Sequence, residues 1–150
     1  MKNEVTLRPI DANNFTACFR LTLGEEQTRF VSNPVRSLAQ AYVYRDQCTP
    51  FGIYSGEVMV GYLLVIFDDD ENTYNLWHVM IDKAEQGKGY GHRGVEQALT
   101  YIATQPFGAS RTVLLTCNPE NAVAYGMYRR MGFAETGRTD EDEVEMSLTI

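Results

Sequence analysis

The segment Gln86-Gly87-Lys88-Gly89-Tyr90-Gly91 decides the fold, because it joins a stretch with strand character to one with helical periodicity. The strand precedes it at Tyr74–Ile81. After it, apolar residues recur at the spacing of one helix face, at Val95, Ala98, Leu99, Ile102 and Ala103. Thr112–Cys117 then alternates as a second strand. A helix that connects two strands of one sheet makes a right-handed crossover, so the two strands are predicted to run parallel.

The remaining elements extend this unit into a mixed α/β fold. Val58–Phe67 is almost entirely apolar, which predicts a central strand that is buried on both faces. Val144–Ile150 alternates, which predicts a strand with one buried face. The acidic run from Asp140 to Glu143 predicts a loop. Periodicity and turn residues predict the other elements: strands at Val5–Ile10 and Phe51–Tyr54, and helices at about Asn14–Leu23, Ser37–Arg45 and Asn121–Met131.

The composition is typical of a soluble globular protein. The chain has 150 residues, of which 44% are hydrophobic and 22% charged, and we expect residues 1–150 to form a single domain. No apolar run is long enough to span a membrane and no signal peptide is visible, so we expect a cytoplasmic protein without a membrane partner. The net charge of −7 argues against a nucleic-acid partner and suits a cationic ligand.

The three cysteines do not form a motif. Cys18, Cys48 and Cys117 are odd in number, widely spaced and outside any Cys-x-x-Cys or Cys/His cluster. This pattern argues against a disulfide framework and against a zinc site, so no metal is predicted. We expect these residues to be small buried hydrophobes.

The glycine loop is typical of a phosphate-binding site. Closely spaced glycines at the start of a helix expose several backbone N–H groups, and the helix dipole adds positive potential there. A dinucleotide fingerprint also matches at Gly89–Gly94, but five residues, 82–86, already separate the strand from this loop, and no acidic residue ends the next strand. The Gly-Lys-Ser/Thr of a P-loop is absent. A turn without a ligand is the remaining structural alternative.

These residues resemble the GNAT family of N-acetyltransferases. The stretch from Ile81 to Gly91 is similar to the acetyl-CoA motif of that family, although Gln86 stands where arginine is usual and Lys83 where proline is frequent. A second stretch is similar to another family motif: Asn121-x-x-Ala124-x-x-Met127-Tyr128-x-x-x-Gly132-Phe133. The resemblance implies a central, mostly antiparallel sheet with one parallel pair splayed for CoA, flanked by about four helices.

The resemblance also implies a role for particular residues. The loop from Gln86 to His92 would bind CoA, and the backbone amides of Gly87, Lys88, Gly89, Tyr90, Gly91 and His92 would hold its pyrophosphate. The side chains of Lys88, His92 or Arg93 would add charge. The main chain of Val79, Met80 and Ile81 would pair with pantetheine and offer an N–H to the thioester oxygen. Asn121 would contact the cosubstrate and Tyr128 would protonate the CoA thiolate. Spacing alone favours a core aromatic over an acid at Tyr128, and it fits Asn121 equally well as a helix N-cap.

The chemistry requires a group that accepts a proton from the amine. A primary amine with a pKa of about 10.4 is mostly protonated at pH 7, at a cost of roughly 4–5 kcal/mol. His78 is the candidate base, with a water chain or a purely structural histidine as alternatives. Glu25 and Glu26 are candidate substrate anchors, or else a solvated pair. Direct attack on the thioester needs no nucleophilic serine or cysteine.

We therefore predict an acetyl-CoA-dependent N-acetyltransferase that acts on a small cationic amine. The stretches Leu76–Asp82 and Ser37–Tyr42 resemble those of bacterial spermine/spermidine (diamine) acetyltransferases, which implies a polyamine acceptor. Another amine (a protein amino group, an aminoglycoside or an amino acid) and a non-catalytic acyl-CoA-binding domain are the alternatives. A homodimer is a further expectation from the family.

Overall fold

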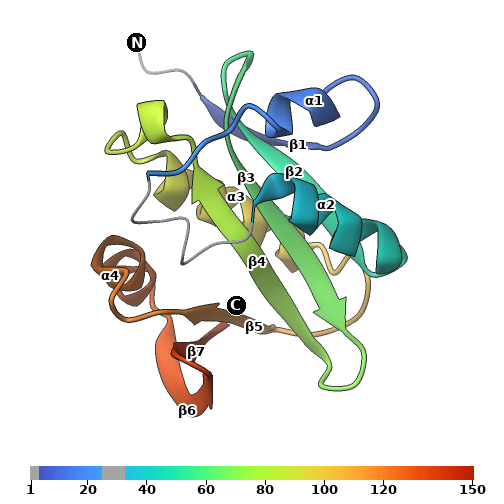
Figure 1. Ribbon diagram of the computed structural model, residues 1–150. Helices are drawn as coiled ribbons and strands as arrows, with labels where there is room; N and C mark the ends of the chain where they lie inside the picture. The colour runs from blue at the N-terminus through green and yellow to red at the C-terminus, as the bar shows by residue number, and fades with distance from the viewer. Residues whose placement is uncertain (1–3, 25–32) are drawn as a thin grey trace.

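The predicted crossover is present in the computed structural model, which describes residues 4–24 and 33–150. Strand β4 (Thr73–Ile81) leads through a short 3₁₀ turn, η1 (Lys83–Glu85), and the glycine loop into helix α3 (Tyr90–Ala103). The chain then returns through β5 (Thr112–Cys117), which lies beside β4 and runs parallel to it (Figure 1).

Five further strands complete a seven-stranded sheet. They are β1 (Val5–Pro9), β2 (Cys48–Ser55), β3 (Val58–Asp68), β6 (Ala134–Asp140) and β7 (Glu143–Thr149). The strand order is β1-β2-β3-β4-β5-β7-β6, and every neighbouring pair other than β4–β5 is antiparallel. The predicted mixed fold with one parallel pair is confirmed.

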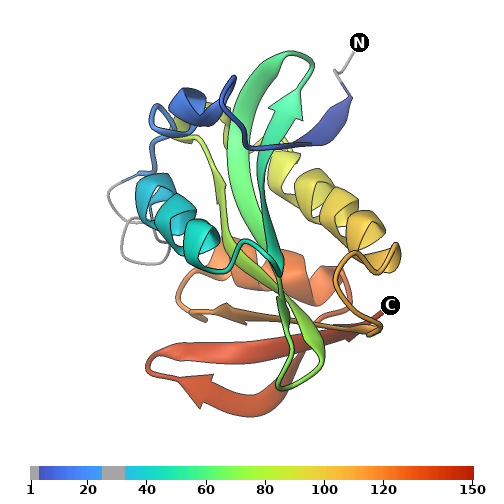
Figure 2. The ribbon, with the colours of Figure 1, turned by 90° about the vertical axis from the view of Figure 1, so that its right-hand side faces the viewer.

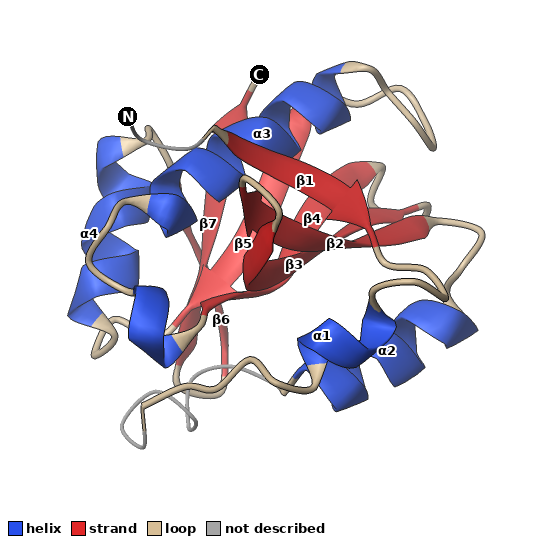
Figure 3. Ribbon diagram, turned by 90° about the horizontal axis from the view of Figure 1, so that it is seen from above, coloured by secondary structure: helices blue, strands red, loops and turns tan. Residues whose placement is uncertain are grey.

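Helices cover both faces of the sheet. Helices α1 (Phe15–Cys18) and α2 (Pro34–Val43) lie on one face and α3 lies on the other (Figure 2). Helix α4 (Ala122–Arg130) lies beside the N-terminal end of α3 (Figure 3). Strand β3 supplies both cores, as predicted for a central strand, because alternate residues point to opposite faces. Leu63, Val65 and Phe67 pack on the α3 side, and Tyr62, Leu64 and Ile66 on the α2 side. Val60 also joins the α3-side core, beyond an irregularity in the pairing of β3 with β2 between Ile53 and Tyr54.

The first two helices differ from the prediction. Helix α1 ends at Cys18 rather than near Leu23, because the chain that follows is bound to the end of β4: the Thr22 amide donates to Asp82 Oδ1 (2.8 Å) and the Thr22 carbonyl accepts from the Lys83 amide (2.6 Å). Helix α2 begins at Pro34 rather than at Ser37. Asn33 caps it, with its side chain accepting from the Arg36 amide.

Strand β6 was not predicted. All seven of its residues are exposed, so its sequence lacks the apolar alternation that identifies a strand. As a consequence, the acidic run from Asp140 to Glu143 forms the two strand ends and the tight turn of the β6–β7 hairpin rather than a long loop.

The cysteines are as expected: Cys18, Cys48 and Cys117 are free and buried. Within the described residues, no helix combines the length and the apolar character that crossing a membrane requires.

Candidate active site

The parallel strands β4 and β5 separate after two residue pairs. Tyr74 and Asn75 pair with Val113 and Leu114, and no pair follows although both strands continue for several residues. The diverging strands border a cavity of about 440 Å³ that is lined by residues 76–79 of β4 and by residues 115–118 at the end of β5. This edge of β4 therefore has no strand opposite it in the part of the chain that the structure describes.

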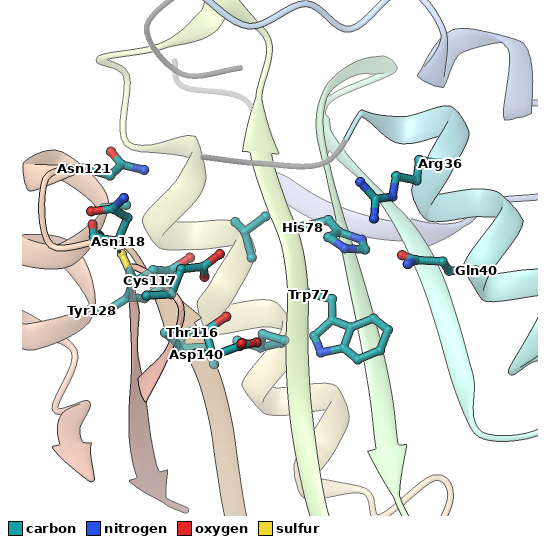
Figure 4. A pocket seen from close by; sticks show the side chains of 15 residues that line it. Arg36, Gln40, Trp77, His78, Thr116, Cys117, Asn118, Asn121, Tyr128 and Asp140 are labelled. Carbon is teal, nitrogen blue, oxygen red and sulfur yellow. Dashed lines mark hydrogen bonds between the residues drawn. The ribbon is translucent and has the colours of Figure 1, made fainter. Parts of the chain in front are cut away.

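A β-bulge shapes the β4 side of the cavity. Trp77 pairs with Leu64 of β3 and Met80 pairs with Tyr62, so that two residues of β4, His78 and Val79, lie opposite one residue of β3. His78 adopts the left-handed conformation, with φ of 59°. Bulges of this kind redirect side chains and are frequent next to active sites. In Figure 4 the His78 ring lies on the α2 side of the cavity, near Arg36 and Gln40.

The glycine loop presents a row of backbone amides. Gly87 and Gly89 have φ values of 80° and 84°, and a Cβ atom at either position would meet nothing within 4 Å. Helix α3 begins at Tyr90 without a side-chain cap. The amides of residues 87–92 donate no hydrogen bond to any described residue. Such N–H groups at a helix N-terminus bind anions readily.

The polar side chains near the loop already have protein partners. Lys88 Nζ pairs with Glu85 Oε2 at 2.9 Å, and His92 Nε2 lies 3.2 Å from Glu96 Oε1. The Arg93 guanidinium stacks over the Tyr90 ring. The backbone amides of residues 87–92, in contrast, have no partner among the described residues that an anion would have to displace.

The loop lies next to one end of the cavity. A Cβ on Gly91 would be 3.6 Å from Ile81 of β4 and 3.7 Å from Met127 of α4. The start of α3 is therefore packed between the end of β4 and the helix that contributes Tyr128. One elongated ligand could contact both the loop amides and the edge of β4.

Tyr128 lies on the far wall of the cavity. Its side chain is buried, and its ring packs edge-on against Phe133. Burial, and then the nearby Cys117 thiol, raise the pKa of the Tyr128 hydroxyl, which therefore stays protonated at neutral pH. Tyr128 is both a core aromatic and a residue that lines the cavity. The two interpretations of the sequence do not exclude each other.

Asn121 precedes α4 and also lines the cavity. It occupies the N-cap position, but its side chain makes no capping hydrogen bond. Asn118 instead orders this turn, with Oδ1 accepting from the Glu120 amide and Nδ2 donating to Asp142. The capping role considered for Asn121 is therefore wrong, and its amide faces the cavity (Figure 4).

Helix α2 forms the opposite wall. His78 Nδ1 lies 2.6 Å from Ser37 Oγ, which in turn lies 2.8 Å from the Tyr62 hydroxyl. Burial, and then the positive charge of Arg36, lower the pKa of His78 to about 4. The ring is therefore neutral at pH 7 but is a weak base.

Several lining residues have no signature in the sequence. Gln40 of α2 has a buried Oε1 atom without a hydrogen-bond partner among the described residues, and a buried acceptor of this kind is costly. Asp140 and Glu143, at the β6–β7 turn, add two carboxylates to the lining, and Arg36 adds one cation. Sequence reasoning missed all four, because only the fold brings α2 and the β6–β7 hairpin to one cavity.

The structure gathers part of the predicted set. His78, Val79, Asn121 and Tyr128 line the cavity. Met80 and Ile81 continue the β4 edge outside the lining, and the residues from Gln86 to His92 form the adjacent loop. Glu25 and Glu26 lie outside the described residues. No three His, Cys, Asp or Glu side chains of residues 4–24 and 33–150 are grouped so that they could hold a metal ion.

Several solved structures, two of them acetyltransferases, share this architecture. The spermidine N-acetyltransferase from Vibrio cholerae, in complex with CoA and spermine, superposes with a TM-score of 0.77, covering 97% of this chain and 95% of that chain at 17% identity. The acetyltransferase from Salmonella typhimurium that modifies the N-terminal serine of ribosomal protein L7/L12 gives 0.70 at 16% identity, with the same coverage. A domain from Methanocaldococcus jannaschii gives 0.77 at 14% identity, covering 99% of both chains. At these identities the likeness shows a common fold.

Sequence comparison identifies the family. No curated protein matches the sequence. A model of the Acetyltransferase (GNAT) family matches residues 15–133, which include β4, the glycine loop, α3 and the Asn121–Phe133 motif. Because this match covers well over half of the chain, the protein belongs to the GNAT acetyltransferase family.

Proposed function

We propose that this acetyltransferase transfers the acetyl group of acetyl-CoA directly to a primary amine of a small polycation such as spermidine or spermine. The observation that supports this best is the juxtaposition at the end of β4. Amides of residues 87–92 that donate to no described residue lie next to a parallel strand pair that opens into a cavity. Together these features suit a ligand with a pyrophosphate at one end and a slender thioester arm at the other.

In this proposal, different groups around the cavity bind different parts of acetyl-CoA. The amides from Gly87 to His92 bind the pyrophosphate. The edge of β4 at Val79–Ile81 pairs with the amides of the pantetheine arm, as a strand would, and directs an N–H at the thioester oxygen. Asn121 contacts the arm from the other side.

Tyr128 fits the role of proton donor to the CoA thiolate. Its raised pKa keeps the hydroxyl protonated, and it lines the cavity beside the β5 end. Because a free thiol has a pKa of about 8.5, the released CoA thiolate takes up a proton at neutral pH, and a protonated hydroxyl beside the sulfur can deliver it. Holding the amine and the thioester together supplies much of the rate without a covalent acyl-enzyme.

The polar lining favours a cationic acceptor. Asp140 and Glu143 offer carboxylates, and the unpartnered Gln40 Oε1 offers a hydrogen-bond acceptor to an ammonium or amine N–H. The chain as a whole carries a net charge of −7, which attracts a polycation over longer distances. The Vibrio cholerae relative in fold was solved with spermine bound.

Arg36 favours a second acceptor class. Its guanidinium lines the same cavity, opposite the two acids, and would repel one end of a polyamine while binding a carboxylate. An amino acid or a peptide amino terminus has an amine and a carbonyl or carboxylate group close together. The Salmonella typhimurium relative in fold modifies an N-terminal serine.

An acceptor panel tests the proposal. Purified protein, acetyl-CoA and a thiol reagent are incubated with spermidine, spermine, an amino acid, an aminoglycoside or a short peptide, and CoA release is followed. We expect release with the polyamines. If CoA is released only with the peptide or the amino acid, the acceptor belongs to that second class and is not a polyamine. CoA binding by calorimetry without release on any amine would instead indicate a non-catalytic acyl-CoA-binding domain.

A further inference from the structure

Ser37 connects two residues that are far apart in the sequence. Its hydroxyl lies 2.6 Å from His78 Nδ1 and 2.8 Å from the hydroxyl of Tyr62. The three residues come from α2, β4 and β3, and both Ser37 and Tyr62 are fully buried. The His78 ring itself lines the cavity. The chain of hydrogen bonds therefore runs from the protein core to the wall of the site.

The number of hydroxyl hydrogens available fixes the direction of these hydrogen bonds. Among the described residues, Ser37 is the hydrogen-bond partner of the Tyr62 hydroxyl, so the Tyr62 hydrogen has one acceptor, Ser37 Oγ. The Ser37 hydrogen is then left for His78 Nδ1, which must be unprotonated to accept it. In the opposite direction His78 Nδ1–H donates to Ser37, Ser37 donates to Tyr62, and the Tyr62 hydrogen is buried without an acceptor. That arrangement costs about 1–3 kcal/mol.

We propose that His78 is a fixed hydrogen-bond donor in this site and not its general base. Nδ1 accepts from Ser37, so the neutral ring has its proton on Nε2, which makes no hydrogen bond to a described residue. Nε2–H then binds an oxygen of a bound substrate, of the carbonyl class. Ser37 and Tyr62 are positioning residues that hold the ring in this tautomer.

The surroundings of His78 agree with this assignment. Burial and the facing Arg36 both disfavour the imidazolium form and lower the pKa of the ring to about 4. The left-handed conformation at the bulge is uncommon for a residue other than glycine, and such strain is frequent where a side chain must be aimed. The tautomer does not depend on the proposed function; only the identity of the bound oxygen does.

Nitrogen NMR of labelled histidine tests the tautomer without any substrate. The chain has two histidines, so His92→Gln leaves His78 as the one signal pair to assign. At pH 7 we expect a protonated Nε2 and an unprotonated Nδ1. Tyr62→Phe should leave this pattern unchanged, because Ser37 still donates to Nδ1. Ser37→Ala should give a mixture of the two tautomers.

Either of two results would overturn the proposal: a protonated Nδ1 in the parent protein, or a change to that tautomer in Tyr62→Phe. The second result would mean that the Ser37 hydrogen has an acceptor other than Nδ1, so that Ser37 does not hold the ring in the proposed tautomer. If Ser37→Ala fails to fold, comparison of the parent protein with the conservative variant Tyr62→Phe still decides between the two directions of the hydrogen bonds.

Kinetics on the best amine test the donor role. His78→Asn retains a side-chain N–H, whereas His78→Leu has none, and losing a donor to a developing oxyanion costs on the order of 10²-fold in kcat. We expect His78→Asn to be clearly more active than His78→Leu, with the acid limb of the pH profile unchanged. Equal losses together with a displaced acid limb would assign His78 as the base. If no amine is acetylated, the proposed function fails, and the NMR result still decides the tautomer.

Discussion

Gly61 of β3 lies against the carbonyl group of Met80 in β4, with no room for a side chain between them. A Cβ atom on Gly61 would collide with the Met80 carbonyl oxygen and would lie 2.7 Å from Ile81 Cδ1. Backbone groups cannot move away as a flexible side chain can. The absence of a side chain at position 61 therefore allows β3 to approach the last residues of β4, immediately after the bulge at His78 and Val79.

Gly61→Ala should consequently displace the edge of β4 that we propose to bind pantetheine. We expect a loss of about 1–3 kcal/mol in the free energy of unfolding, as for other overpacked interiors, together with weaker CoA binding. Urea denaturation and calorimetry measure the two effects. Gly126→Ala in α4 is the control, because its Cβ meets only the flexible end of Arg130 and alanine favours helix by roughly 0.5–1 kcal/mol. Unchanged stability of Gly61→Ala would contradict this account.

The glycine loop offers a test in which backbone strain is matched. Gly89 and Gly137 both have positive φ, 84° and 94°, and at both a Cβ atom would meet nothing within 4 Å. Alanine should destabilise each position by a similar amount, about 1–2 kcal/mol. Only Gly89→Ala should also weaken CoA binding, by tenfold or more, because its methyl group would stand where the pyrophosphate approaches. Equal CoA affinity of the two variants would exclude the loop as the phosphate site.

Most of the fold could be predicted because periodicity reports burial. The apolar run of β3 and the spaced apolar residues of α3 are local signals, and both elements are present within a few residues of their predicted bounds. Strand β6 has no buried residue and therefore no signal. Helix α1 is short because Thr22 binds Asp82, sixty residues away, and no local pattern encodes that contact.

The parts of the candidate site that are formed by the backbone could be predicted from the sequence. The parts formed by side chains from distant segments were missed. Closely spaced glycines at the start of a helix identify the loop as a candidate anion site, and a family motif identifies Tyr128 as a candidate proton donor. Gln40 has no pattern around it, and its role depends on an atom that is left without a partner after folding. His78 was identified from the sequence, but the burial that lowers its pKa is not visible there, so the donor role that we propose for it could be inferred only from the fold.

Tyr128→Phe tests the proposed proton donor. We expect kcat to fall by about 10²–10⁴-fold with little change in stability, because the ring and its packing against Phe133 are retained. The raised pKa also predicts that deprotonation of Tyr128 does not produce a basic limb near neutral pH. Tyr125→Phe, on the same helix but with its hydroxyl bonded to Glu135, should retain full activity. If both variants retain full activity, Tyr128 is a core aromatic alone.

Gln40→Met should stabilise the fold and weaken the binding of the amine. Removing the unpartnered Oε1 while retaining the volume should raise the free energy of unfolding, by about 1 kcal/mol or more, because a buried unsatisfied acceptor is lost. If Gln40 Oε1 receives an N–H of the acceptor, the KM for the amine should rise in the same variant while the KM for acetyl-CoA is unchanged. Gln97→Met, on the exposed face of α3, is the control and should change neither. A stable variant with the parental KM would remove Gln40 from the acceptor site.

His78 should make the folded state less stable in mild acid. Its pKa is 6.5 in the unfolded chain and about 4 in the folded protein, lowered by burial and by Arg36. Above pH 6.5 both states hold a neutral ring and the stability is complete. As the pH falls from 6.5 towards 4, the unfolded chain binds a proton that the folded protein does not, so the free energy of unfolding decreases.

Comparison with His78→Asn isolates this contribution, because the other titrating groups cancel in the difference between the two proteins. Between pH 7 and pH 5 we expect the parent protein to lose about 1–2 kcal/mol more than the variant, after allowance for the part of the ring that contacts solvent. Urea denaturation at pH 7, 6 and 5 measures it. Parallel stability curves would mean that His78 is protonated in the folded protein as easily as in the unfolded chain, and a ring with that property could not be the neutral donor proposed for the cavity wall.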